Sequence, residues 1–259
     1  VNMVFHSEYP TIRWLEANGY DVTYWSGVDA HERGAELPAR ARVFISTGHD
    51  EYWSGEQRSF VEAARDQGVH LCFLSGNEVY WKVRWEASLL GEPMRTLVVY
   101  KESQESFKID PDAKTWTGTF RDGRAINPQG ARPENALTGT IYTANAWRND
   151  PLVVPGAYAG LRFWRHTDVA ALRPSQKAVL LKGLLGHEFD EDIDNGFRPA
   201  GLIRLSETVV HNVQMIVDAG SCYDSGAATH HLVMYRAASG ALVFGAGTVQ
   251  WAWGLDNVH

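Results

Sequence analysis

The sequence predicts an α/β fold, a doubly wound parallel sheet with a β-rich insertion or extension in its second half. The buried-strand pattern at 42–47 and the apolar run at 69–75 are typical of buried parallel strands. Helical segments separate these runs over short joints, which is the alternation that such a sheet requires. Beyond residue 100 a long polar stretch is followed by further strand-like runs. We therefore expect one domain over 1–259, with an α/β core in 1–100 and an excursion plus β-rich completion in 101–259.

The first half supplies the alternation. Pro10 suits a first helical turn and Gly19 suits a helix end, so a helix is predicted over 11–18. Ser54 followed by Gln57 is a capping-box pattern, which predicts a helix to about Gln67. The other elements predicted here are strands at 21–25, 42–47 and 69–75, and a helix at 78–86 that carries Tyr80, Trp81 and Trp85.

The second half reads differently. A strand is predicted over 96–101, and the segment 103–132 is polar, rich in Gly, Pro and Asp, and without a clear period. Because Trp116 and Phe120 need burial, we expect this segment to be a folded excursion rather than a linker. Strand-like runs follow at 208–210, 231–236 and 241–244.

Composition excludes some classes of protein. The 259 residues carry 31 acidic against 24 basic side chains, a net charge of −7. This acidic balance without a basic stripe argues against a nucleic-acid partner. No stretch approaches the ~18 apolar residues of a membrane span. Two cysteines cannot form a disulfide framework. The chain starts at Val1 without an initiator Met or a signal sequence, so we expect a piece of a longer polypeptide or a processed chain, and its localisation stays open.

Polar side chains follow both predicted buried strands. Ligands of open parallel sheets bind beyond the carboxyl ends of the strands. The segment 48–53 (GHDEYW) and the segment 75–78 (SGNE) are placed there, although a solvated approach to a helix is the alternative for the first. Ser75 lacks a G-x-S-x-G elbow and no Cys occupies the turn, so covalent catalysis has weak support.

Other motifs carry less weight. The acidic run 190–196 imitates a calcium loop, but Gly201 stands where the bidentate Glu belongs, which leaves a solvated turn or a noncanonical cation site. His230 and His231 are adjacent on a predicted strand and point to opposite faces, so a structural role is favoured. The sequence contains no C-x-x-C or H-E-x-x-H zinc pattern.

Five segments together carry a resemblance that covers essentially the whole chain. They are GHDEYWS (48–54), FLSGNEVYWKVRWE (73–86), RPENALTG (132–139), GHEFDEDIDNGFRPAGL (186–202) and ATHHLVMYRAASGALVFGAGTVQWAWGLD (228–256). The chain resembles the C-terminal domain of the large subunit of N,N-dimethylformamidase. The resemblance implies a glutamine-amidotransferase-like fold. It also implies a mononuclear iron held by two tyrosines and one glutamate, whose bound water attacks a formamide and releases formate and an amine.

Carried onto this sequence, the resemblance names candidate residues. The implied metal ligands are Tyr52, Tyr9 and Glu134, with Tyr80 as an alternative phenolate or a core residue. The candidates for orienting groups and for acid or base roles are His49, Asn77, Glu188 and Glu51, each weighed against a structural role. A metal suits this chemistry because an amide carbonyl is a poor electrophile and the chain shows no activated Ser or Cys.

The leading hypothesis is an iron-dependent hydrolase of small amides. If the dimethylformamidase arrangement applies, a small subunit and homo-oligomer formation are expected. The alternative is a catalytically silent binding or scaffold domain of a larger protein, since abundant Trp residues also serve binding. A third and weaker possibility is another glutamine-amidotransferase-like chemistry, against which the absent Cys argues.

Overall fold

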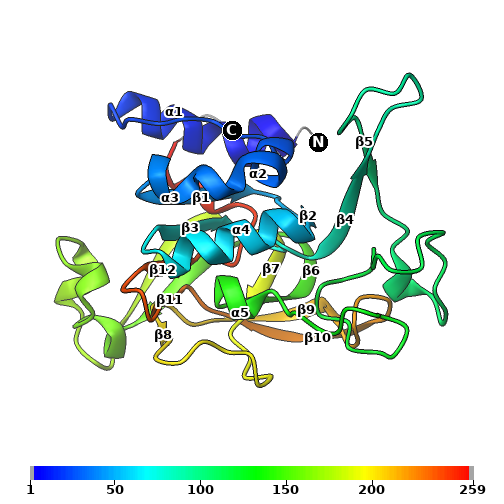
Figure 1. Cartoon of the computed structure of the whole chain (residues 1–259). Helices are drawn as coiled ribbons and strands as arrows, with labels where there is room; N and C mark the ends of the chain where they lie inside the picture. The colour runs from blue at the N-terminus through cyan, green and yellow to red at the C-terminus, as the bar shows by residue number, and fades with distance from the viewer. Residues whose placement is uncertain (1–2, 257–259) are drawn as a thin grey trace.

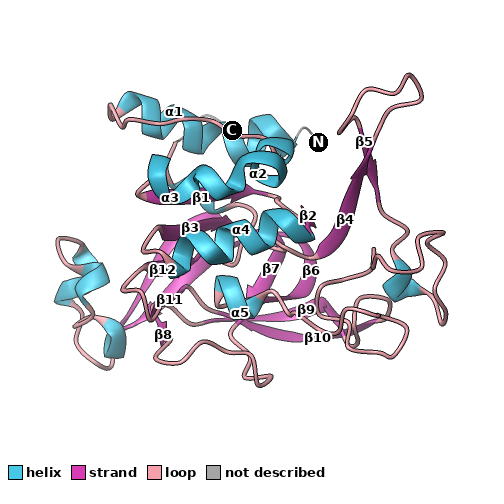
Figure 2. Ribbon diagram, viewed as in Figure 1, coloured by secondary structure: helices cyan, strands magenta, loops and turns pink. Residues whose placement is uncertain are grey.

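The computed structural model describes residues 3–256 and shows a mixed α/β protein with a partly parallel sheet. The helices of the first half gather on one side of the central strands, and the long antiparallel strands of the second half lie on the other side (Figures 1 and 2). The helices are α1 (Tyr9–Ala17), α2 (Gly27–Arg33), α3 (Leu37–Arg40), α4 (Gly55–Asp66) and α5 (Asn135–Thr138). Short π- and 3₁₀-helical turns lie between the main elements, the π turn spanning Val4–Glu8. The expected α/β class with a β-rich second half is thereby confirmed at this level.

The central sheet joins both halves of the chain. Its strands, in spatial order, are β1 (Val43–Gly48), β3 (His70–Ser75), β12 (Leu242–Gly245), β11 (Val233–Arg236) and β8 (Ile203–Arg204). The pairings of β1 with β3 and of β3 with β12 are parallel, and the other two are antiparallel. The predicted strands at 42–47 and 69–75 are therefore present. Because β12 comes from the far end of the sequence, the third parallel strand belongs to the second half.

Two predicted helices are confirmed, and local chemistry explains where each begins. Pro10 occupies the first turn of α1, where its missing N–H is not needed. The Ser54 hydroxyl accepts a hydrogen bond from the backbone N–H of Gln57 at 3.1 Å, so α4 begins at Gly55 as expected. Val61 and Ala64 on α4 are buried in the core.

The predicted strand at 21–25 is wrong, because residues 20–26 have no regular structure. The sequence beyond them begins a helix instead. Ser26 and Asp29 form a reciprocal capping box that starts α2. Tyr20 and Tyr24 project outward, so this segment lacks the buried face that a strand of the sheet would have.

The predicted helix at 78–86 is also wrong. The chain forms β4 (Trp81–Glu86), which pairs in parallel with β2 (Tyr52–Ser54) and antiparallel with β5 (Thr96–Val98). Trp81 and Val83 are buried, whereas the charged residues Lys82 and Arg84 are partly exposed. This alternation is the period of a strand, and aromatic and β-branched side chains favour it. β4 and β5 form an arm that projects from the body of the molecule (Figure 1).

The second half forms an antiparallel sheet that closes on itself in the order β10-β7-β6-β9. Its strands are β6 (Ile141–Pro155), β7 (Lys177–Glu191), β9 (Thr208–Ile216) and β10 (Tyr223–His230). Leu152, Leu185 and Phe189 are fully buried in the core that this sheet shares with β3 and β12. Among residues 3–256, no helix is both long and apolar enough to cross a membrane.

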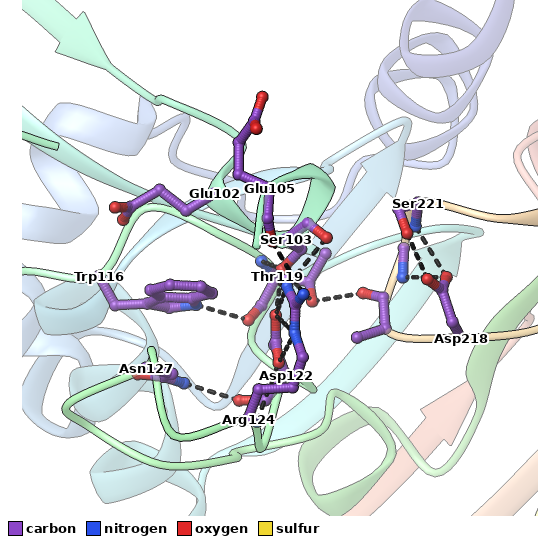
Figure 3. A network of polar contacts seen from close by, with 12 residues as sticks. Glu102, Ser103, Glu105, Trp116, Thr119, Asp122, Arg124, Asn127, Asp218 and Ser221 are labelled. Atoms are coloured by element: carbon purple, nitrogen blue, oxygen red, sulfur yellow. Dashed lines mark hydrogen bonds and ion pairs between the residues drawn. The ribbon is translucent and has the colours of Figure 1, made fainter. Parts of the chain in front are cut away.

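The polar excursion is ordered by hydrogen bonds rather than by secondary structure. Trp116 and Phe120 are 1% and 3% exposed, so they are buried as expected. The buried carboxylate of Glu102 accepts hydrogen bonds from the backbone N–H groups of Ile109 and Thr117 at 2.9 and 3.0 Å. Figure 3 shows the neighbouring network, in which Ser103, Thr119, Asp122 and Arg124 converge. Side chains thus accept the backbone hydrogen bonds that strands or helices would otherwise accept.

Candidate metal centre

The two polar segments lie together at the carboxyl edge of the parallel strands, as the sequence predicts. Gly48 at the end of β1 pairs with Ser75 at the end of β3. His49 and Asn77 therefore leave the sheet from adjacent positions. Parallel strands present their carboxyl ends at one edge, which is where such sheets bind ligands.

Strand β7 is fixed against this edge by the segment that follows β12. The backbone N–H of Thr248 donates to the carbonyl of Ser75 at 2.9 Å, and that of Val249 donates to the carbonyl of Glu188 at 3.3 Å. A Cβ at Gly76 would lie 2.8 Å from the Glu188 carbonyl, so the close approach of the two chains requires glycine. Glu188 is consequently held beside His49 and Asn77.

Three side chains at this edge form a cluster that is able to hold a metal ion. His49, His187 and Glu188 each offer one ligand atom, and these atoms lie within 4.8 Å of one another. The three residues, which we call the metal cluster, are partly buried. Nε2 of His49 lies 2.6 Å from Oε2 of Glu188, and the two imidazole rings meet edge to face with centroids 5.7 Å apart.

Sequence reasoning missed His187, because consecutive residues of a strand normally point to opposite faces. His187 has a left-handed backbone with φ 60°, which breaks that alternation and lets it share a site with Glu188. The pairing of β6 with β7 is also irregular here, with Ala146 opposite His187 and Asp150 opposite Leu185. In the sequence, this site is marked by the adjacent residues Gly-His-Glu alone. A regular strand could contain the same three residues, so they do not predict the left-handed backbone.

The electrostatics favour an ionised Glu188. Burial alone would raise its pKa, but the hydrogen bond and charge of His49, together with the Asn77 amide, lower it. Burial alone would lower the pKa of His49, but the hydrogen bond and charge of Glu188, together with the charges of Glu51 and Asp50, raise it. The Asn77 amide donates to Oε2 of Glu188 at 2.8 Å, and the Tyr142 hydroxyl donates to Oε1 at 3.3 Å.

Glu51 and Tyr52 border the cluster. Oε2 of Glu51 lies 3.6 Å from Nε2 of His49, and burial raises the pKa of this carboxyl. Burial and then the charge of Glu51 raise the pKa of the Tyr52 phenol, while a hydrogen bond with Lys101 opposes them. The structure therefore brings together all four side chains considered for acid, base or orienting roles (His49, Asn77, Glu51 and Glu188) and sets Tyr52 beside them.

Tyr9 and Glu134 are found in other surroundings. Tyr9 is 40% exposed on α1, where it packs on Phe5 and beneath the Arg13 guanidinium. Glu134 is buried and forms an ion pair with Arg121. Their assignment as iron ligands, together with that of Tyr52, stays a prediction. Tyr80 is buried between the rings of Trp81 and Tyr142, a position that suits its core alternative.

Glu134 and Arg121 belong to a second group, the acidic cluster, which also contains Glu78 and Asp190. All three carboxylates are about 1% exposed. Asp190 accepts hydrogen bonds from the Asn77 backbone N–H and the Thr140 hydroxyl, both at 2.9 Å. Among the described residues, no hydrogen-bond partner reaches the Glu78 carboxyl. Burial, followed for Glu78 by the charge of Asp190, raises the pKa of Glu78 well above its usual value. Burial raises the pKa of Asp190 to about 7.

The remaining sequence candidates have structural partners. The Asp192 carboxylate is paired with Arg198 at 2.6 Å and with Arg204 at 2.7 Å, which fits a structural turn better than a cation site. His230 is fully buried, and its Nε2 lies 2.8 Å from the Ala246 carbonyl oxygen. Its structural role agrees with the expectation from the sequence.

The donor set of the metal cluster has a definite chemical preference. Two imidazoles and one carboxylate are the ligands of open zinc sites in hydrolases and of non-haem iron sites. The side chains already lie within reach of a common centre and remain partly accessible to solvent. The residues present therefore fit a first-row metal ion, whose identity the donor set alone does not fix.

The family model described as N,N-dimethylformamidase beta subunit-like, C-terminal, matches residues 2–259. No curated protein matches the chain.

Proposed function

The chain belongs to the family of N,N-dimethylformamidase beta subunit-like C-terminal domains, and from this premise we propose that it is a metal-dependent hydrolase of small amides. The observation that carries the proposal is the cluster of His49, His187 and Glu188 at the carboxyl edge of β1 and β3. The proposed fold class is glutamine-amidotransferase-like, which the parallel strands β1, β3 and β12 support.

We propose that the metal cluster holds the ion and that the ion is a single iron, as the resemblance implies. When bound, such an ion acidifies water and polarises an amide carbonyl. The second candidate ligand set is Tyr9, Tyr52 and Glu134. Of these, Tyr52 borders the cluster, whereas Glu134 already neutralises Arg121.

The other residues of the site have roles that follow from their positions. Glu51 lies next to His49 and accepts a proton from the attacking water in this proposal. Its raised pKa makes it a stronger base than an exposed carboxylate. Proton transfer is most efficient when the pKa of the base lies near the working pH, so this shift favours the role. Asn77 and Tyr142 fix the Glu188 carboxylate by binding its two oxygens. Such supporting hydrogen bonds maintain ligand geometry.

The test combines metal analysis with an assay. The purified chain, loaded with Fe²⁺ or Zn²⁺, is expected to bind one ion and to release formate from N,N-dimethylformamide. His187→Ala is expected to lose both properties and to keep its thermal unfolding midpoint, since the side chain is partly exposed. Glu92→Gln, on the projecting arm, serves as the control with unchanged metal content and activity.

The result also decides between the two readings of the chain. Protein that binds no metal and cleaves no formamide would favour a silent binding or scaffold domain. Metal-loaded protein with a phenolate charge-transfer colour that Tyr52→Phe abolishes would favour the tyrosine ligand set instead.

The proposed assembly follows from the family. A beta subunit-like domain implies a subunit context, so we propose association with a small subunit and with further copies of the chain. Light scattering of the chain, alone and co-expressed with a small subunit, measures the mass of each assembly.

A further inference from the structure

Strand β6 is interrupted directly opposite the metal cluster. Between the pairs Ala146–His187 and Asp150–Leu185, the residues 147–149 of β6 face the single residue Gly186 of β7. Extra residues of this kind turn a side chain away from its regular direction, and they are frequent beside active sites. Trp147 is the first residue of the interruption and is 73% exposed.

Trp147 contacts a residue of the metal cluster. Its indole meets the imidazole of His187 edge to face, with ring centroids 4.0 Å apart at 76°. A single exposed aromatic side chain on a protein surface is ordinary. An exposed indole packed on a candidate metal ligand is different, because it lies directly beside the candidate site.

The position of Trp147 is fixed by its neighbours. A Cβ at Gly186 would collide with the backbone carbonyl of Arg148, so glycine permits the close approach of the two strands. The Arg148 guanidinium donates to the His211 carbonyl at 2.7 Å. The Gln250 amide donates to the Asn149 side chain at 3.0 Å. These contacts hold the two residues that follow Trp147, and a rigid support is what a recognition residue needs.

We propose that Trp147 is a specificity-determining residue, whose indole contacts the N-alkyl groups of an amide bound at the metal cluster. Indole offers a large, rigid apolar surface, whereas the cluster itself offers charged and polar groups. An N-alkylated amide has both parts: a carbonyl for the polar groups and methyl or larger substituents for the indole. Unsubstituted formamide has only the first part. This inference rests on the proposed function, since it names the class of amide that the same site prefers.

The first measurement is of binding and needs no turnover. In protein labelled with ¹⁵N-tryptophan, the indole N–H resonance absent from Trp147→Phe identifies Trp147. N,N-dimethylformamide is expected to shift that resonance, and formamide at the same concentration is expected to shift it far less. Equal shifts with the two amides, or no shift with either, would overturn the inference.

The second measurement is kinetic. Trp147→Ala is expected to raise KM for N,N-dimethylformamide roughly tenfold, the lower end of what a methylene-sized contact contributes to discrimination. KM for formamide and the metal content are expected to stay the same. Phe107→Ala, which removes an aromatic side chain exposed elsewhere, is the matched control. An unchanged ratio of the two KM values in Trp147→Ala would exclude the role.

The two proposals fail in different ways. If the wild-type chain hydrolyses neither amide but the Trp147 resonance responds selectively, hydrolysis is wrong and recognition of N-alkyl groups stands. If hydrolysis is observed while the resonance and the KM ratio do not respond, the proposed function stands and Trp147 has no part in specificity.

Discussion

The metal cluster and the acidic cluster adjoin each other and differ in how they accommodate charge. Asn77 links them, because its side chain donates to Glu188 and its backbone N–H donates to Asp190. Glu188 is partly accessible and has imidazole partners, so its pKa is lowered. Asp190 and Glu78 are buried, and their pKa values are raised. Glu188 and Asp190 lie close together in sequence, yet the pKa of the first is lowered and that of the second is raised.

The difference indicates which carboxylates are ionised and therefore suit a metal ion. In the acidic cluster, Arg121 is the guanidinium paired with Glu134, and two further carboxyls lie in the same buried region. Burial without a counter-charge favours the neutral acid. A neutral acid is a poor ligand for a cation, whereas the ionised Glu188 is a good one. Solvent access and the charge of the neighbouring side chains, rather than residue type, therefore distinguish the metal cluster from the acidic cluster.

The largest expected effect separates the two clusters directly. Glu188→Gln is expected to lower metal affinity and amide hydrolysis by more than about a hundredfold, since a lost ligand costs more than a lost supporting contact. Its unfolding midpoint is expected to change little. Asp190→Asn should show the reverse pattern, with metal affinity kept and stability altered. Calorimetric titration with Zn²⁺ and thermal unfolding measure the two properties, and equal loss of metal in both variants would contradict the distinction.

Removal of the buried cation is expected to have the next largest effect, on stability. Arg121→Met leaves Glu134 buried without its partner, which costs roughly 3–5 kcal/mol in comparable buried pairs. Urea unfolding measures this loss. Arg40→Met, at an exposed pair with Glu36, is the control and should change little. The double variant Arg121→Met with Glu134→Gln should recover part of the loss, and no recovery would indicate that packing rather than charge is responsible.

A smaller effect is expected at the link between the clusters. Asn77→Gly removes the amide that binds Glu188 but keeps a residue that tolerates the left-handed backbone, φ 50°. Metal affinity is expected to fall about tenfold, as for other groups that orient a ligand. Titration with Zn²⁺ measures it. An unchanged affinity would show that the imidazole contact alone holds Glu188.

The smallest effect is a pH-dependent gain in stability. The raised pKa of Glu78 means that the folded state holds its proton more tightly than the unfolded state does. The stability from this group is complete below the ordinary value of 4.5 and is lost as the pH rises through the folded pKa. Glu78→Gln should therefore raise the unfolding midpoint at pH 8 by about 2–4 °C, if the gain is near 1 kcal/mol. At pH 4 the gain should nearly vanish, and the same gain at both values would contradict this origin.

The sequence supported the strands that flank the site better than the site itself. Apolar runs located β1 and β3, and from them the polar segments at the carboxyl edge. The helix predicted over 78–86 is wrong, because apolar and charged residues alternate along Trp81–Glu86 and form a strand. Alternation of apolar and charged residues with a period of two indicates a strand more strongly than the aromatic residues indicate a helix. The partnership of the distant β12 with β3 has no local signature.

The metal cluster shows the same limit at the level of single residues. His49 and Asn77 were found because they follow strands whose ends are predictable. His187 was not found, because its place depends on a left-handed backbone in the middle of β7. The family resemblance implies Glu134 as a ligand, but its sequence motif does not show that Arg121 is its partner. Local sequence patterns thus predict the edge of the sheet where the site lies. Which residues form the site depends on contacts between segments that are distant in sequence.

The segment after β12 has a consequence for how the protein is made. Its backbone bonds to Ser75 and Glu188 connect β3 with β7, in addition to the direct contacts of Asn77. A ribosome delivers residues 246–249 more than fifty positions after Glu188. A nascent chain that stops short of them contains His49, His187 and Glu188. It lacks the hydrogen bonds that connect Ser75 and Glu188 through residues 248 and 249. Competence to bind a metal is therefore expected to arise late in translation.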